Sequence, residues 1–90
     1  MSFFKTDRGL DWYYEVSGVG ETIVMIHGLG GSGGFWQAQK DFLQTDFQVL
    51  TLDLPGHGKS AWMPVTLIEM AADICQILSS IGILKFSLIA

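Results

Sequence analysis

Residues 22–34 read TIVMIHGLGGSGG, and this stretch decides the fold. Its first five residues form a continuous apolar or β-branched run bounded by a glycine turn. Such a run is typical of a strand buried on both faces, as in a parallel sheet. Glycine recurs through residues 28–34, which are expected to form a loop. The stretch therefore predicts a buried strand that ends in a glycine-rich loop.

The elements on either side of this strand follow an alternating order. Strands are expected at residues 3–6, 10–16, 22–26, 47–54 and 85–90, and helices at 35–44 and from 65 or 66 to 81. The last three strands alternate with helices, an order that requires right-handed crossovers and a parallel sheet. The fold class is therefore expected to be α/β, and no repeat or linker divides residues 1–90.

The second helix carries the clearest periodicity in the chain. Its apolar positions follow the i, i+3, i+4, i+7 spacing of one buried face and are Leu67, Met70, Ala71, Ile74, Ile77, Leu78 and Ile81. Thr66 and Glu69 form a predicted capping box, and Gly82 supplies the C-terminal stop. Cys75 flanks the apolar face, so a buried, inert thiol is expected.

Composition excludes several classes of function. Five Lys and Arg against nine Asp and Glu give a net charge of −4, without a basic cluster for nucleic acid or an anionic membrane surface. One cysteine and two histidines provide neither a disulfide framework nor a zinc site, so we expect no metal. No apolar run reaches the length of a membrane span, and the charged start is not a signal peptide. A cytoplasmic location is expected.

Two motifs invite a nucleotide interpretation. Residues 58–60 end like a Walker A loop, but Asp53 stands where that motif needs a glycine. Residues 28–33 fit G-x-G-x-x-G between a strand and a helix, and Asp53 lies where a ribose-binding acid would follow. Two strands precede this loop, however, and His27 directly abuts it. A dinucleotide-binding unit is therefore retained only as an alternative, and no cofactor is expected.

A second motif, DLPGHGKS at residues 53–60, follows the next strand. Together with H-G-L-G at 27–30 and the later Trp36, it resembles the α/β-hydrolase family, in which H-G-x-G follows the third strand and D-x-x-G-x-G-x-S the fourth. The resemblance covers nearly the whole chain and implies the N-terminal part of that fold: a mostly parallel sheet, an antiparallel N-terminal pair and two crossover helices.

The resemblance also implies site residues. The backbone N–H of Leu29 would donate to an oxyanion, Gly28 and Gly30 would shape the loop, and His27 and Trp36 would lie at the binding site. H-G-x-G, rather than the H-G-x-P common in epoxide hydrolases and haloalkane dehalogenases, favours acyl chemistry on an ester, thioester or lactone.

In the family the nucleophile elbow, G-x-S-x-G, directly follows the strand that corresponds to Phe86–Ala90, and no such motif follows that strand in these 90 residues. The acid and the catalytic histidine come later still in the family. Residues 1–90 are thus expected to be one partial domain, truncated before the elbow and inactive alone, in a parent serine hydrolase. The alternative is a non-catalytic truncated module.

Several residues of the motifs have a structural interpretation. Asp53, His57 and Ser60 lie within one glycine turn, so Asp53 and Ser60 are expected to bond to loop backbone rather than form a triad. His27 is expected to anchor its loop by hydrogen bonds, and Trp36 either floors an acyl pocket or packs the first helix. Alternation places Tyr13 on the opposite strand face from its neighbour Tyr14.

The last strand, Phe86–Ala90, is expected to form an open edge if the family's strand order holds. It is apolar apart from the neighbouring Lys85, and its unpaired N–H and C=O groups can template another strand. Self-association through this strand, or association with the missing C-terminal part, is therefore expected. The other partner expected is a small acyl substrate of the parent enzyme.

Overall fold

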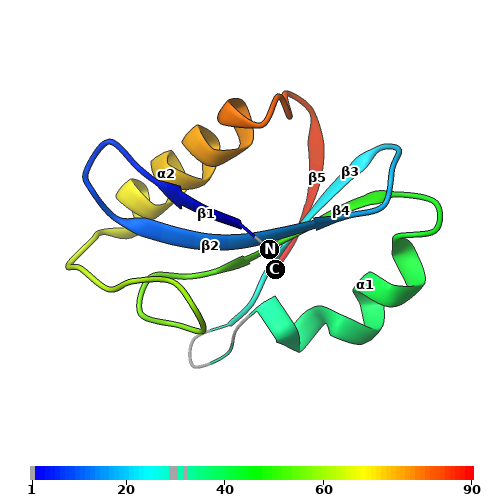
Figure 1. Ribbon diagram of the computed structural model, residues 1–90, viewed down its shortest axis with the longest axis horizontal. Coiled ribbons are helices and arrows are strands. Elements are labelled where there is room, and N and C mark those ends of the chain that lie inside the picture. The colour runs from blue at the N-terminus through cyan, green and yellow to red at the C-terminus, as the bar shows by residue number, and fades with distance from the viewer. Residues whose placement is uncertain (1, 29–30, 32) are drawn as a thin grey trace.

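The computed structural model describes residues 2–28, 31 and 33–90, and its elements follow the predicted order (Figure 1). They are β1 (Ser2–Lys5), β2 (Asp11–Ser17), β3 (Thr22–Ile26), the 3₁₀ helix η1 (Gly33–Trp36), α1 (Gln37–Leu43), β4 (Gln48–Asp53), α2 (Leu67–Ser80) and β5 (Phe86–Ile89). The expected strands and the second helix are confirmed to within two residues at each end.

The strands form one mixed sheet in the order β1-β2-β4-β3-β5. β1 pairs with β2, and β2 with β4, in antiparallel fashion, whereas β3 runs parallel to both β4 and β5. The parallel part of the sheet is thus the part whose strands are joined through helices. As expected, β3 lies inside the sheet, where Val24 stands between Leu50 and Leu88, and β5 lies at its edge.

The two helices lie on opposite faces of the sheet (Figure 1). The chain passes from β3 to its neighbour β4 through α1, and then returns through α2 to β5 on the other side of β3. Two right-handed crossovers that run in opposite directions along a sheet place their helices on opposite faces. Within the described part of the chain, neither helix has the length and apolar character needed to cross a bilayer.

The hydrophobic core lies between α2 and the sheet. Its fully buried members are Leu10, Trp12, Val24, Leu50, Leu52, Ile77 and Leu78. The predicted capping box is confirmed: the Glu69 N–H donates to the Thr66 hydroxyl, and the Thr66 N–H donates to the Glu69 carboxylate. Gly82, at φ 81°, ends the helix as predicted.

The predicted apolar face of α2 is wrong at its N-terminal end. Leu67 is 81% exposed, and Ala71 is exposed too. Asp73 faces the sheet instead, because the indole N–H of Trp12 on β2 donates to its carboxylate. With Asp73 facing the sheet, the side of α2 that carries Leu67 and Ala71 is rotated towards solvent. The same rotation exposes Cys75, which was expected to be buried.

The first helix also differs from its prediction. It begins as η1 and continues as α1, and the apolar residues that indicated it, Phe35 and Phe42, are exposed. The buried residue of α1 is Lys40. The fully buried contact of this helix with the sheet is therefore a charged one, between Lys40 and Glu15.

Candidate functional site

Two loops meet at the carboxyl ends of β3 and β4, as they must where neighbouring strands run parallel. One begins at His27 and leads into η1, and the other is the turn at residues 53–60. The rings of His27 and His57 bring the loops together, with centroids 5.1 Å apart. Sequence motifs that lie some 25 residues apart are thus neighbours in space.

His27 fastens the first loop to the second. Its ring is 3% exposed, and Nε2 accepts the backbone N–H of Leu54 at 2.9 Å. With Nε2 acting as acceptor, Nδ1 carries the proton and donates to the carbonyl of Gly28 at 2.7 Å. The expectation of a hydrogen-bonded loop anchor is confirmed, since both ring nitrogens are occupied by backbone groups.

The turn at residues 53–60 holds itself by side-chain bonds to its own backbone. The Lys59 N–H donates to the Asp53 carboxylate at 2.8 Å, and the Ser60 hydroxyl donates to the Asp53 carbonyl at 2.5 Å. Gly58 has φ 51°, and a Cβ there would lie 2.2 Å from the Asp53 carboxylate. The structural interpretation of Asp53 and Ser60 is confirmed, because both bond to loop backbone.

The remaining predicted site residues are placed only in part. Leu29 and Gly30 lie outside the described residues. Gly28 is described, and its carbonyl accepts the N–H of Gly31 at 3.0 Å. Trp36 is half-buried at the start of α1 and stacks edge-on against Phe35, with centroids 5.1 Å apart. A role for Trp36 in an acyl pocket stays a prediction.

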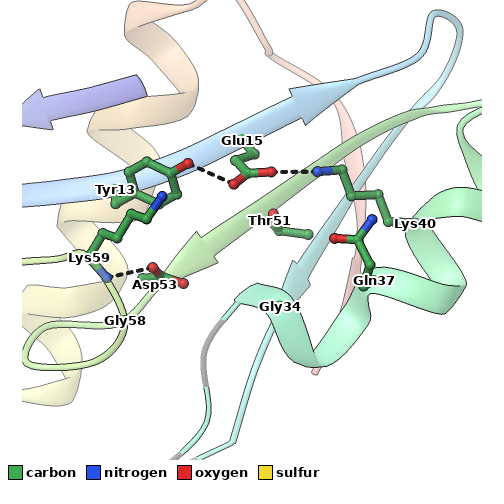
Figure 2. A pocket seen from close by; sticks show the side chains of 9 residues that line it. All are labelled: Tyr13, Glu15, Gly34, Gln37, Lys40, Thr51, Asp53, Gly58 and Lys59. Carbon is green, nitrogen blue, oxygen red and sulfur yellow. Dashed lines mark hydrogen bonds and ion pairs between the residues drawn. The ribbon is translucent and has the colours of Figure 1, made fainter. Parts of the chain in front are cut away.

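A polar cavity on the α1 face of the sheet was not predicted. It has a volume of about 230 Å³ and lies between β2, β4, α1 and the turn (Figure 2). Glu15 is its centre: Lys40 donates to one carboxylate oxygen at 2.6 Å, and the Tyr13 hydroxyl donates to the other at 2.7 Å. The Lys59 ammonium lies over the Tyr13 ring, 4.9 Å from its centroid. The alternation of β2 could have indicated this cavity, since it places Tyr13 and Glu15 on one face.

These contacts shift the acid–base properties of both residues. The hydrogen bond from Lys40, aided by the one from Tyr13, holds the pKa of Glu15 below its ordinary value. The hydrogen bond to Glu15, together with burial and the charges of Glu15 and Asp53, raises the pKa of Tyr13 to about 12. At neutral pH Glu15 is therefore a carboxylate and Tyr13 a protonated phenol, joined by one short hydrogen bond.

A second unpredicted cluster lies on the opposite face, under α2. Asp73 is 3% exposed and accepts the Nε–H of Arg8 at 3.0 Å and the indole N–H of Trp12 at 3.2 Å. Arg8 also donates to Glu69 at 3.1 Å. In the sequence, the signal that could have indicated this cluster is Asp73, an acidic residue among the apolar positions of the helix. The cluster joins the turn between β1 and β2 to α2, and the core is built around it.

Within the described ranges, no three His, Cys, Asp or Glu side chains are placed to hold a metal ion. The site therefore consists of two glycine-rich loops locked together by His27, at the edge where parallel strands end, beside a polar cavity. Asp53 belongs to the turn itself, where its carboxylate serves the loop backbone.

The sequence model of the alpha/beta hydrolase fold matches residues 21–90, and the chain belongs to this family. Among curated relatives, the pimeloyl-[acyl-carrier protein] methyl ester esterase of Vibrio atlanticus is 49% identical over 49 residues, which cover 54% of this chain and 19% of that enzyme. The expected α/β-hydrolase fold, with its antiparallel N-terminal pair, parallel strands and two crossover helices, is confirmed, and the sheet is mixed, with two antiparallel and two parallel strand pairings among the described residues.

Solved structures agree with this assignment. An esterase from Exiguobacterium antarcticum superimposes with a TM-score of 0.88 at 27% identity over 97% of this chain and 34% of that one. Est816, described as an N-acyl homoserine lactone degrading enzyme, gives a TM-score of 0.87 at 29% identity over the same shares. The chain thus spans about a third of these structures, and 19 to 28% of the length of the first curated relatives.

Proposed function

We propose that the protein carrying this chain hydrolyses a small acyl substrate, an ester, thioester or lactone, with a serine nucleophile that lies beyond residue 90. The observation that carries the proposal is the lock of His27 onto Leu54 and Gly28. It holds the start of the glycine-rich loop at the carboxyl edge of the parallel strands, where substrates bind in open α/β sheets. The relatives that act on esters and lactones support the same chemistry.

In this proposal the chain supplies part of the oxyanion site. Serine attack on the carbonyl carbon places negative charge on the carbonyl oxygen, and the N–H of Leu29 donates to it. Gly28 and Gly30 let the backbone turn its N–H groups towards one point. The alcohol or thiol then leaves, and water releases the acid from the serine. Residues 1–90 carry none of the triad in this proposal, so they form one partial domain that is inactive alone.

The test is hydrolysis of p-nitrophenyl acetate by the whole protein and by residues 1–90. We expect turnover from the first and none from the second above a denatured control. In the whole protein, Leu29→Pro removes the N–H, and the loss of an oxyanion donor lowers kcat by about 10²–10³. Leu29→Ala keeps the N–H and serves as the matched control. Equal activity of the two variants would contradict the assigned donor, and turnover by residues 1–90 would contradict the assigned nucleophile.

We propose further that the edge of β5 takes a strand from a second copy of the chain or from the rest of the protein. Phe86, Leu88 and Ile89 are exposed, and within the described residues β5 pairs with β3 alone. Such an edge favours strand addition. In sedimentation of residues 1–90 we expect a species larger than the monomer, which Leu88→Lys weakens. A monomer at about tens of micromolar, a concentration at which weak association between protein copies is still detectable, would contradict this proposal.

A further inference from the structure

Helix α1 has no fully buried apolar residue, although Leu43 at its end is half-buried. Among its seven residues Lys40 is the buried one, whereas Phe42 is 80% exposed. Its N-cap residue, Trp36, makes no capping hydrogen bond from its side chain. A helix this short is marginal in water unless tertiary contacts stabilise it. The fully buried side chain through which α1 contacts the sheet is therefore that of Lys40.

Lys40 reaches the sheet through Glu15. The Lys40 side chain is only 10% exposed, and its ammonium lies 2.6 Å from the Glu15 carboxylate (Figure 2). The Tyr13 hydroxyl holds the other oxygen of that carboxylate, so the acceptor is itself fixed in orientation. The pair is buried on the Lys40 side, whereas the Glu15 side chain is 37% exposed. Its short, doubly hydrogen-bonded geometry is specific, and loss of Glu15 leaves the buried Lys40 charge without its partner. The pair therefore fixes α1 at one position over β2.

The position of α1 matters because of what precedes it. η1 begins at Gly33 and runs directly into α1, so it is the C-terminal support of the loop that starts after β3. The N-terminal support is His27, which is bonded to Leu54 and Gly28. The loop thus has one support at each end, and the second is held by a contact with β2.

We propose that Lys40 and Glu15 are positioning residues for hydrolysis: they fix η1 and α1, and through them the end of the glycine-rich loop, without touching substrate. This inference rests on the proposed acyl hydrolysis. A donor displaced by about 1 Å can cost on the order of 10²-fold in rate, so a polar contact remote from the carbonyl can control kcat. Tyr13 contributes by orienting Glu15.

The experiment combines kinetics with amide hydrogen exchange in the whole protein. Lys40→Met and Glu15→Gln should lower kcat for p-nitrophenyl acetate by about tenfold or more while KM changes by less than about twofold, since the affected interaction forms in the transition state. Exchange at residues 34–43 should become faster, with α2 unchanged. Lys40→Arg keeps the ion pair and should restore most of kcat. The Glu15→Gln/Lys40→Met double variant should be no worse than the worse single variant, because the two residues act as a unit.

Arg8→Met is the matched control, because it breaks an ion pair of similar kind on the opposite face of the sheet. It should lower the free energy of unfolding and leave kcat unchanged below the melting transition. An equal fall of kcat in Arg8→Met, or unchanged kcat in Lys40→Met, would overturn the positioning role. If the wild type hydrolyses no acyl ester, the proposed function fails. Exchange at residues 34–43 then decides whether the pair anchors α1, and unchanged exchange in Lys40→Met would overturn that as well.

Discussion

Ser60 allows a sharp test of whether the turn at residues 53–60 is structural or catalytic. Tyr13 and Asp53 are register partners at the end of the β2–β4 ladder. The Ser60 hydroxyl lies between their backbones: it accepts the N–H of Tyr13 at 2.7 Å and donates to the carbonyl of Asp53 at 2.5 Å. One hydroxyl thus bridges the two strands at the last pair of the ladder. Ser60→Ala removes both hydrogen bonds at once.

The expected loss follows from these two bonds. Each contributes a net of about 0.5–1.5 kcal/mol, so Ser60→Ala should lower the free energy of unfolding by about 2 kcal/mol. Tyr13 and Asp53 are both buried, so water cannot readily replace the lost hydrogen bonds to their backbone groups. The loss per bond should therefore lie in the middle or upper part of the range given above. Ser79→Ala, at an exposed position near the end of α2, is the matched control and should change stability by less than about 0.5 kcal/mol.

The assay is urea unfolding followed by tryptophan fluorescence, with p-nitrophenyl acetate hydrolysis measured on the same samples. A structural Ser60 predicts lower stability and unchanged kcat at temperatures where the variant is folded. The reasoning is refuted if Ser60→Ala is as stable as Ser79→Ala. It is equally refuted if kcat disappears while stability is kept, because Ser60 would then serve the reaction.

Three further outcomes are expected. Lys40 and Tyr13 lower the pKa of Glu15, so the Glu15 contacts stabilise the folded state at pH values above the ordinary pKa of 4.5. This stability is lost as the pH falls through the lower pKa of the folded state. Glu15→Gln should therefore reduce the fall of the urea midpoint at acid pH. Because Glu15 raises the pKa of Tyr13 to about 12, Glu15→Gln should move the Tyr13 titration back towards 10, and an unmoved tyrosinate absorbance curve would contradict the contact. Gly58→Ala should lower the free energy of unfolding by about 3 kcal/mol or more, because its Cβ would lie 2.2 Å from the Asp53 carboxylate. Gly9→Ala also has a positive φ but open space around its Cβ, and should lower it by about 1 kcal/mol. Equal losses in thermal melts would refute the steric argument.

Local patterns in the sequence were sufficient to predict the architecture of this chain. The order of strands and helices, the capping box at Thr66 and the stop at Gly82 depend on residues a few positions apart, and all are confirmed. The same holds for the turn at residues 53–60, whose side chains bond to their own backbone. The two glycine-rich motifs also predicted which edge of the sheet carries the site, because parallel strands end at a common edge.

Tertiary structure alone decided which charged groups are buried and which apolar ones are not. Lys40 finds Glu15 25 positions away, and Asp73 finds Arg8 65 positions away. Helical periodicity shows that a face exists, but not how far a helix rotates to satisfy such a partner. For that reason Leu67, Ala71 and Cys75 are exposed against expectation, and α1 is held by an ion pair instead of its phenylalanines. A buried charge is stable only beside its partner, and the fold brings the two together.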